Sequence, residues 1–98
     1  MRVRFDPEAA EELAEAARYL ADRSPDLAER FLSDVAGAKD LLLRFPHASP
    51  PLRGGLRRVL LKTLPYQLVY RVEGDEVRIY AVAHLKRKPG YWRRRVQR

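Results

Sequence analysis

The sequence predicts an α+β domain in which an antiparallel helical hairpin packs on one face of a mainly antiparallel sheet, in the order β-α-α-β-β-β. Two observations predict this class. Apolar residues recur every three or four positions between residues 7 and 45, which is the period of amphipathic helices. From residue 56 the period changes to two, as in strands. With 46% hydrophobic residues, residues 1–98 are expected to form one domain with a small core.

The first half of the chain contains a short strand and two helix start signals. Residues 2–5 alternate between basic and apolar side chains and are expected to form the strand. Asp6 is a good N-cap and Pro7 suits the first turn of a helix. A Ser-Pro-Asp sequence at residues 24–26 repeats the signal, and Pro46 ends the second helix. Because the connection is so short, the two helices must fold back on each other.

The second half of the chain is expected to form a three-stranded meander after an irregular loop. The predicted strands are residues 56–63, 66–72 and 77–84. A Gly-Asp pair at residues 74–75 fits a two-residue hairpin turn, and a Leu-Pro pair at residues 64–65 fits a tight link. A Pro-Gly pair at residues 89–90 prevents a further strand and leaves a basic C-terminal tail.

The two turns set the register of the strands and therefore which side chains share a face. The face covered by the helices is expected to pair Val72 with Val77, Tyr70 with Ile79, Leu68 with Ala81 and Tyr66 with Ala83, and to include Val59 and Leu61. The uncovered face is expected to pair Arg71 with Arg78, Val69 with Tyr80 and Gln67 with Val82, and to include Arg58, Leu60, Lys62 and His84.

On the uncovered face, Arg58, Arg71 and Arg78 are predicted to form a row across three adjacent strands. Like charges directly opposite each other destabilise a sheet, so the row predicts a site for an acidic partner. The alternative is that these long side chains spread into solvent and screen one another.

The charge of the chain is unevenly distributed. Residues 56–98 hold twelve Lys/Arg and three Asp/Glu, whereas residues 1–55 hold eight and ten. Such an asymmetry indicates an anionic partner, either a nucleic acid or an acidic protein segment. His84, Arg87 and Tyr91 follow the last strand, and a histidine there can exchange a proton near neutral pH. A surface or capping role is the competing interpretation for His84, and Tyr91 and Trp92 are expected to anchor the tail rather than to form a platform for stacking bases.

Composition also predicts what the protein lacks. Without cysteine it has no disulfide and no thiolate metal site, and its two histidines lack the spacing of a zinc site, so we expect neither metal nor cofactor. The first residues do not form a signal peptide, and no segment has the ~20 apolar residues of a membrane span. A cytoplasmic protein without a membrane partner is the expectation.

Three segments of the sequence resemble the RelE/ParE superfamily of bacterial toxins. The first is the Phe-Asp-Pro-Glu-Ala sequence at residues 5–9, followed by Leu13 and Tyr19. The second is the Pro-Tyr-Gln-Leu-Val-Tyr-Arg-Val strand at residues 65–72. The third is the Val-Ala-His-Leu-Lys-Arg-Lys-Pro-Gly-Tyr-Trp ending at residues 82–92, which is similar to plasmid-stabilisation members. The resemblance covers nearly the whole chain.

This resemblance implies a growth-inhibiting toxin of a type II toxin–antitoxin system, bound in a hetero-oligomer and silenced by a cognate antitoxin. RelE-like members enter the ribosome and cleave mRNA, whereas ParE-like members lack the nuclease residues and poison DNA gyrase. In the RelE-like case the resemblance implies catalytic roles for His84, Arg87 and Tyr91. The residues implied to bind an anion, a nucleic acid or the antitoxin are Arg58, Lys62, Arg71, Arg78 and Arg87.

The sequence departs from the nuclease pattern and favours the ParE-like, non-enzymatic mode. Only one histidine lies near the implied site, no acid accompanies it, and the first strand of the meander carries one lysine. Because arginine is too basic to exchange protons, His84 alone would have to carry that chemistry. Gyrase inhibition is therefore the leading interpretation, and a ribosome-dependent mRNA endoribonuclease is the alternative.

Two further classes remain open. A plain nucleic-acid-binding module explains the charge, but both predicted helices carry acidic faces that do not suit groove reading. An inactive scaffold that only docks an antitoxin is the other. We expect the antitoxin segment to be partly disordered when free and to combine apolar anchors with acids. Its acids are expected to meet Arg58, Arg71, Arg78 and Arg87.

Overall fold

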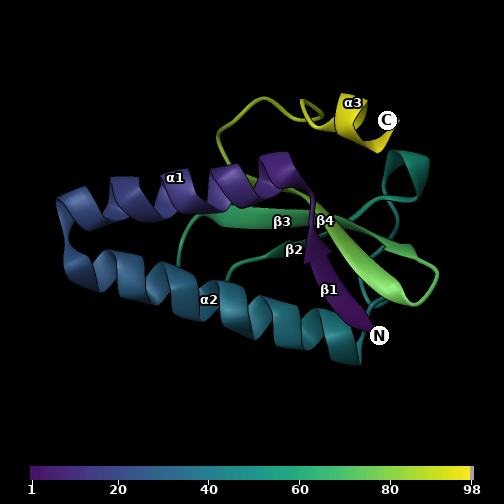
Figure 1. The fold of residues 1–98 in the computed structure, drawn as a ribbon, viewed down its shortest axis with the longest axis horizontal. Coiled ribbons are helices and arrows are strands. Elements are labelled where there is room, and N and C mark those ends of the chain that lie inside the picture. Colours follow the sequence, from purple (N-terminus) through teal and green to yellow (C-terminus); the bar gives the residue numbers. More distant parts are fainter. Residues whose placement is uncertain (98) are drawn as a thin grey trace.

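The protein is a helical hairpin packed on a four-stranded sheet (Figure 1). The computed structural model describes residues 1–97, so Arg98, one of the basic residues counted above, lies outside the described residues. The predicted α+β class and element order are confirmed. The elements are β1 (Arg2–Phe5), α1 (Pro7–Arg23), α2 (Pro25–Arg44), a 3₁₀ turn (Arg53–Gly55), β2 (Arg57–Leu60), β3 (Tyr66–Glu73), β4 (Glu76–His84) and a short α3 (Arg93–Val96).

Both helices begin where the sequence indicates. Asp6 is the N-cap of α1, and its carboxylate accepts a hydrogen bond from the backbone N–H of Glu8 at 3.3 Å. Ser24 ends α1 and is also the N-cap of α2, so a single residue joins the two helices. The helices therefore run antiparallel side by side along one face of the sheet (Figure 1).

The sheet has the order β1-β4-β3-β2, with β1 parallel to β4 and the other pairs antiparallel. Gly74 and Asp75 form the predicted two-residue turn between β3 and β4, and Gly74 has the positive φ of 62° that such turns require. The main core lies between the sheet and the helices. Its largest fully buried members include Phe31 and Leu42 of α2 and Leu68, Tyr70, Val77 and Ile79 of the sheet.

A β-bulge at Tyr80 changes the predicted pairing of β3 with β4. The pairs next to the turn are as predicted up to Tyr70 with Ile79, but the register then shifts by one residue. Leu68 pairs with Val82 rather than with Ala81, and Tyr66 pairs with His84 rather than with Ala83. The extra residue in β4 reverses the alternation of its side chains beyond the bulge.

The reversal exchanges side chains between the two faces of the sheet. Val82, predicted on the uncovered face, belongs to the core beneath the helices, whereas Ala81 and Ala83 lie on the opposite face. His84 also changes face. Its ring contacts Tyr66 edge-on at 5.1 Å between centroids, and Tyr66 packs against Phe31 of α2. The prediction that His84 lies on the uncovered face is therefore wrong.

β2 is shorter than predicted and shifted by two residues along β3. Arg58 lies opposite Val69 rather than Arg71. The predicted two-residue link is instead a longer loop, in which the N–H of Leu61 bonds to the carbonyl of Tyr66 at 2.9 Å. Because a shift of two residues preserves the alternation, Val59 and Leu61 still face the core. Arg58 still lies on the other face, but it does not continue the row of arginines.

The C-terminal segment covers part of the sheet face that was predicted to be uncovered. Trp92 is 7% exposed and forms a second core with Leu56, Val69, Tyr80, Ala81 and Ala83. Tyr91 packs against the same cluster, so the predicted anchoring of the tail by these two aromatic residues is confirmed. We call this side of the sheet the tail face. Among the described residues, no helix has the length and apolar character needed to span a membrane.

Candidate functional site

The arginine pair at the centre of the tail face is neutralised by acids of the same chain. Arg71 and Arg78 lie directly opposite each other, as predicted. Glu73 accepts a hydrogen bond from Arg71 Nε at 2.9 Å, and Asp6 accepts one from an Arg78 guanidinium nitrogen at 3.0 Å. The Tyr80 hydroxyl donates a short hydrogen bond to Glu73. The expectation that this pair needs an external acidic partner is therefore wrong.

These contacts determine the pKa of Glu73. Burial alone raises the pKa of this carboxyl, but hydrogen bonds from Tyr80 and Arg71 and the positive charges of Arg71 and Arg78 outweigh burial. The pKa of Glu73 therefore lies below its ordinary value of 4.5. In turn, burial and the bond to Glu73 raise the pKa of Tyr80, so that its hydroxyl stays protonated.

A Glu73→Gln variant is expected to lose about 2 kcal/mol of stability at neutral pH, where Glu73 accepts charge-assisted hydrogen bonds. Because the folded-state pKa is lowered, this contribution is present above pH 4.5 and is lost as the pH falls through the folded-state value. Urea unfolding at about pH 7 should therefore show a difference in the free energy of unfolding between wild type and variant, and this difference should become smaller at about pH 3. A difference that is the same at both pH values contradicts the assignment, and the exposed Glu29→Gln change is the control.

The tail is held against the helices by one buried carboxylate, Glu12 of α1. Its side chain accepts a hydrogen bond from the backbone N–H of Val82 at 3.0 Å. Val82 lies in the part of β4 that does not pair with β1. It also accepts hydrogen bonds from Arg87 at 3.2 Å, Tyr91 at 2.7 Å and Arg95 at 2.8 Å. We call these contacts the Glu12 cluster. They join α1, β4 and the tail.

Two residues with implied catalytic roles, Arg87 and Tyr91, therefore have their polar groups in the Glu12 cluster. The Arg87 guanidinium also stacks over the Tyr91 ring at 3.9 Å from its centroid. Burial raises the pKa of Tyr91, and the hydrogen bond to Glu12 raises it further. The Tyr91 hydroxyl thus keeps its proton and donates a hydrogen bond to Glu12.

His84, the third implied catalytic residue, lies on the helix side of the sheet. It lines a shallow hollow with Glu15 and Tyr19 of α1. Its Nδ1 accepts the backbone N–H of Lys86 at 3.1 Å, so the proton of a neutral imidazole is carried on Nε2. Arg87 lines the same hollow but is paired with Glu12, and the sheet separates His84 from Arg58.

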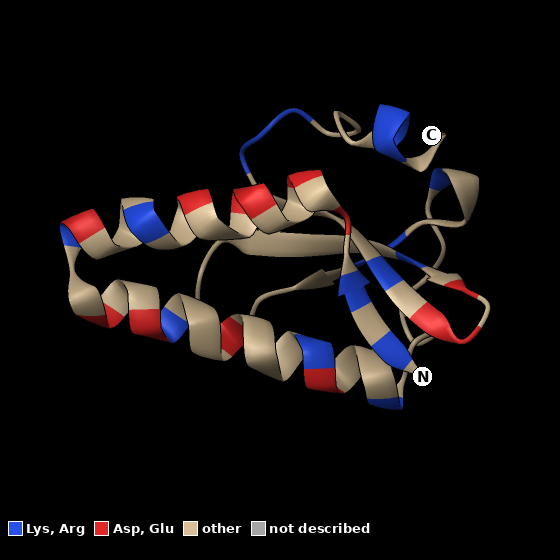
Figure 2. Ribbon diagram, viewed as in Figure 1, with Lys and Arg blue, Asp and Glu red and all other residues tan. Residues whose placement is uncertain are grey.

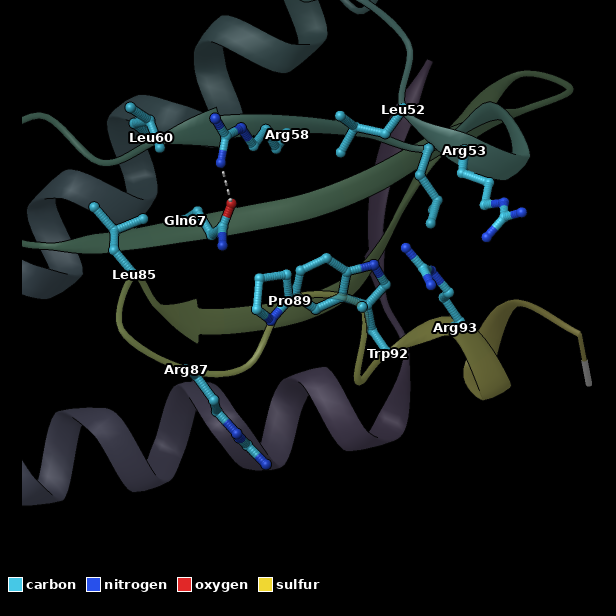
Figure 3. Close-up of a pocket in the computed structure, with 12 residues that line it drawn as sticks. Leu52, Arg53, Arg58, Leu60, Gln67, Leu85, Arg87, Pro89, Trp92 and Arg93 are labelled. Carbon is cyan, nitrogen blue, oxygen red and sulfur yellow. Dashed lines mark hydrogen bonds between the residues drawn. The ribbon is translucent and has the colours of Figure 1, made fainter.

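The tail face contains a groove with a volume of about 450 Å³ between β2 and the tail (Figure 3). Trp92 and Gln67, both largely buried, lie along it, and Leu60 and Leu85 are exposed at one end. Four of its lining residues are arginines and none is acidic. The lining residues are Leu52, Arg53, Leu56, Arg58, Leu60, Gln67, Leu85, Arg87, Pro89, Gly90, Trp92 and Arg93.

Three of the four groove arginines keep their charge uncompensated. Within residues 1–97, no acid lies within ion-pair distance of Arg53, Arg58 or Arg93, and Arg58 bonds only to the Gln67 amide at 3.4 Å. Figure 3 shows Arg53 and Arg93 together at the end of the groove away from Leu60, and Arg87 pointing away from it toward the helix. The groove therefore combines an apolar floor with a positive rim.

The family model for the ParE toxin of the type II toxin–antitoxin system parDE matches residues 3–89. This chain belongs to the ParE toxin family. No curated protein matches it significantly. A solved structure described as the chromosomal ParDE TA system from P. aeruginosa is similar with a TM-score of 0.72 and 22% identity, covering 88% of this chain and 97% of that one. At that identity the likeness shows a shared fold.

In this ParE-family toxin, the predicted binding residues divide into two groups. Arg71, Arg78 and Arg87 are paired with acids of the chain, whereas Arg58 and Lys62 have no ion pair among the described residues. Lys62 lies beside α2 rather than on the tail face. Among residues 1–97 there is also no group of three or more His, Asp or Glu side chains arranged to hold a metal ion.

Sequence reasoning missed four residues that shape this site. Arg53 and Arg93 were assigned to a loop and a solvated tail, and only the fold brings them together. Arg95 was also expected in the basic tail, but its side chain is 11% exposed and lies in the Glu12 cluster. Glu12 did leave a signal in its spacing, because it lies three residues after Ala9 and four before Ala16, on a helix face with apolar neighbours.

Proposed function

We propose that this toxin arrests bacterial growth by poisoning DNA gyrase, without cleaving RNA, and that a cognate antitoxin neutralises it in the cytoplasm by forming a hetero-oligomer with it. The observation that supports this most directly is that the polar groups of two implied nuclease residues are occupied by an acid of the chain. Arg87 and Tyr91 are bound to Glu12, and His84 lies on the other side of the sheet from Arg58.

Cleavage of RNA at the 2′-hydroxyl needs a base, an acid and a cation around a single phosphate. In this protein the Tyr91 hydroxyl donates a hydrogen bond to Glu12, and its raised pKa makes loss of its proton unfavourable. Arg87 is shared between Glu12 and the Tyr91 ring. The cation that shares a hollow with His84, Arg87, is thus already paired with an acid of the chain.

The groove on the tail face is better suited to a protein partner. It is lined by exposed Leu52, Leu60 and Leu85 around Trp92, and its free arginines can each make two-pronged contacts with carboxylates. Figure 2 shows acidic residues along α1 and basic residues in the tail beside it, where Glu8 and Glu12 pair with tail arginines. An acidic, partly apolar antitoxin segment matches the groove in both respects.

Expression of the chain alone tests the proposal. We expect growth arrest, accumulation of gyrase–DNA cleavage complexes, and unchanged 5′ ends of translated mRNA. A His84→Ala variant should arrest growth as the wild type does, whereas a nuclease that depends on this residue would slow by about 10²–10⁴-fold.

Two results would contradict the proposal. Cuts within translated codons that disappear in His84→Ala would identify a ribosome-dependent endoribonuclease. Normal growth at full expression would instead identify a nucleic-acid-binding module or an inactive scaffold. Co-expression of the neighbouring antitoxin gene is the control, because it should restore growth.

A further inference from the structure

The side chains that line the tail-face groove offer hydrogen-bond donors, and their one acceptor is already used. The lining arginines carry donors only. Among the described residues of the lining, the side-chain acceptor is the amide oxygen of Gln67, which accepts a hydrogen bond from Arg58 at 3.4 Å. The groove is therefore complementary to a ligand that carries acceptors and negative charge.

Two of these donors belong to largely buried side chains and have no acceptor within residues 1–97. Trp92 is 7% exposed and Gln67 is 6% exposed. The indole N–H and the amide NH₂ group make no hydrogen bond with a described residue, and neither nitrogen is fully buried, so both reach the surface of the groove. Figure 3 shows the indole nitrogen on the side of the ring toward Arg53 and Arg93. Because buried donors are nearly always paired, these two point to a ligand that supplies their acceptors.

The free charges are spread along the groove. The Arg93 guanidinium lies against Gly90, where a Cβ would come within 2.9 Å of its Cζ atom, so the absence of a side chain at Gly90 permits this position. Arg93 thereby lies beside Arg53 at one end, and Arg58 lies farther along toward Leu60 (Figure 3). This distribution suits a ligand that repeats its negative charge along its length.

A strand of DNA combines these properties. Each phosphodiester carries one negative charge and accepts hydrogen bonds without donating any. Deoxyribose is largely apolar and can pack on Leu52, Leu60 and Pro89 of the lining. The 2′-hydroxyl of RNA would add a donor for which the lining side chains have no free acceptor. Because Trp92 is too buried to stack on a base, the contacts are made with the backbone and carry no sequence preference.

We propose that the tail-face groove binds one sugar–phosphate strand of DNA, with phosphates bound by Arg58 and by the pair Arg53 and Arg93, and that the toxin contacts through it the DNA held by gyrase. The second part of this inference rests on the proposed function. An antitoxin segment in the same groove would exclude the strand, in agreement with its neutralising role.

Binding of a single-stranded deoxyuridine oligonucleotide of about ten nucleotides to the purified full chain tests the site. Three neutralised phosphates predict that log affinity falls with log salt concentration with a slope of about −2. A double Arg53→Gln, Arg93→Gln variant should bind at least about tenfold more weakly, with a slope of about −0.7. Both arginines are exposed and have no ion pair within residues 1–97, so the thermal unfolding of the variant should match wild type.

A double Arg18→Gln, Arg30→Gln variant is the matched control, because it removes the same charge from exposed positions of the helical hairpin. It should bind the oligonucleotide as the wild type does. An equal loss of affinity in both double variants would show diffuse attraction to the net charge and would overturn the inference.

Two further probes decide the class of ligand. A uridine oligonucleotide of the same length differs mainly in its 2′-hydroxyl groups and should bind more weakly. Equal or tighter binding of this RNA would contradict a DNA site. Polyaspartate of matched charge should also bind more weakly, and equal affinity for it would identify an acidic protein as the ligand.

Growth and cleavage complexes separate this inference from the proposed function. If the chain arrests growth, the Arg53→Gln, Arg93→Gln variant should accumulate fewer gyrase–DNA cleavage complexes than the Arg18→Gln, Arg30→Gln control. Full arrest by that variant, together with no binding of the oligonucleotide by wild type, would sink the DNA site while the proposed function stands. Binding that depends on Arg53 and Arg93 in a chain that does not arrest growth would instead support the DNA site and sink the proposed function.

Discussion

Replacing Glu12 with alanine should lower the free energy of unfolding by about 3–5 kcal/mol, the range observed when one partner of a buried ion pair is removed. Glu12 is 9% exposed, and the side chain of its partner Arg95 is 11% exposed. Without Glu12, the Arg95 charge loses its main counter-charge. The Val82 N–H and the Tyr91 hydroxyl also lose their acceptor.

Urea unfolding of Glu12→Ala beside Glu11→Ala measures this effect at matched positions. Glu11 precedes Glu12 in α1 and is exposed, so its replacement should change the free energy of unfolding by less than about 0.5 kcal/mol. Glu12→Gln should fall between wild type and Glu12→Ala, because an amide oxygen can still accept the Val82 N–H but cannot neutralise the arginines. Equal stability of the Glu12 and Glu11 variants would show that the cluster does not hold the tail.

Replacing Trp92 with alanine should also lower the free energy of unfolding by about 3–5 kcal/mol, as is typical for truncation of a buried tryptophan. Trp92 is 7% exposed and packs in the core of the tail face with Val69 and Tyr80. Its ring also contacts Tyr91 edge-on at 5.0 Å between centroids. The substitution would therefore leave a cavity under the tail and remove one wall of the groove.

The Trp92→Ala variant should consequently lose antitoxin affinity as well as stability. Leu52→Ala is the control for stability, because Leu52 lines the same groove but is 41% exposed and should cost less than about 1 kcal/mol. Thermal unfolding and titration with the antitoxin measure the two effects separately. An unchanged unfolding temperature for Trp92→Ala would show that the tail does not pack on the sheet in solution.

The Glu12 cluster and the Trp92 core act on the same segment from two sides. Glu12 holds the tail to α1 through charged hydrogen bonds, and Trp92 holds it to the tail face through apolar contact. Together they position Arg93 beside Arg53 at the end of the groove. The cationic rim is thus built from residues that lie forty positions apart in the chain.

Local patterns in the sequence were enough to determine the elements and their order. The capping signals at Asp6 and Ser24, the change of period at residue 56 and the Gly-Asp turn at residues 74–75 each depend on near neighbours only, and each is found in the structure. The two-residue alternation also placed Arg71 opposite Arg78, because the turn that sets this pair is only three residues away along each strand.

The site was decided by tertiary structure. One extra residue in β4, at Tyr80, moved His84 to the helix side, and no local pattern marks such a bulge. Contacts between segments far apart in the chain paired Arg71 and Arg78 with Glu73 and Asp6. The sequence thus specified which charged residues this toxin has. Packing determined which of those charges remain unpaired, because an ion pair depends on the distance between two groups in the folded chain.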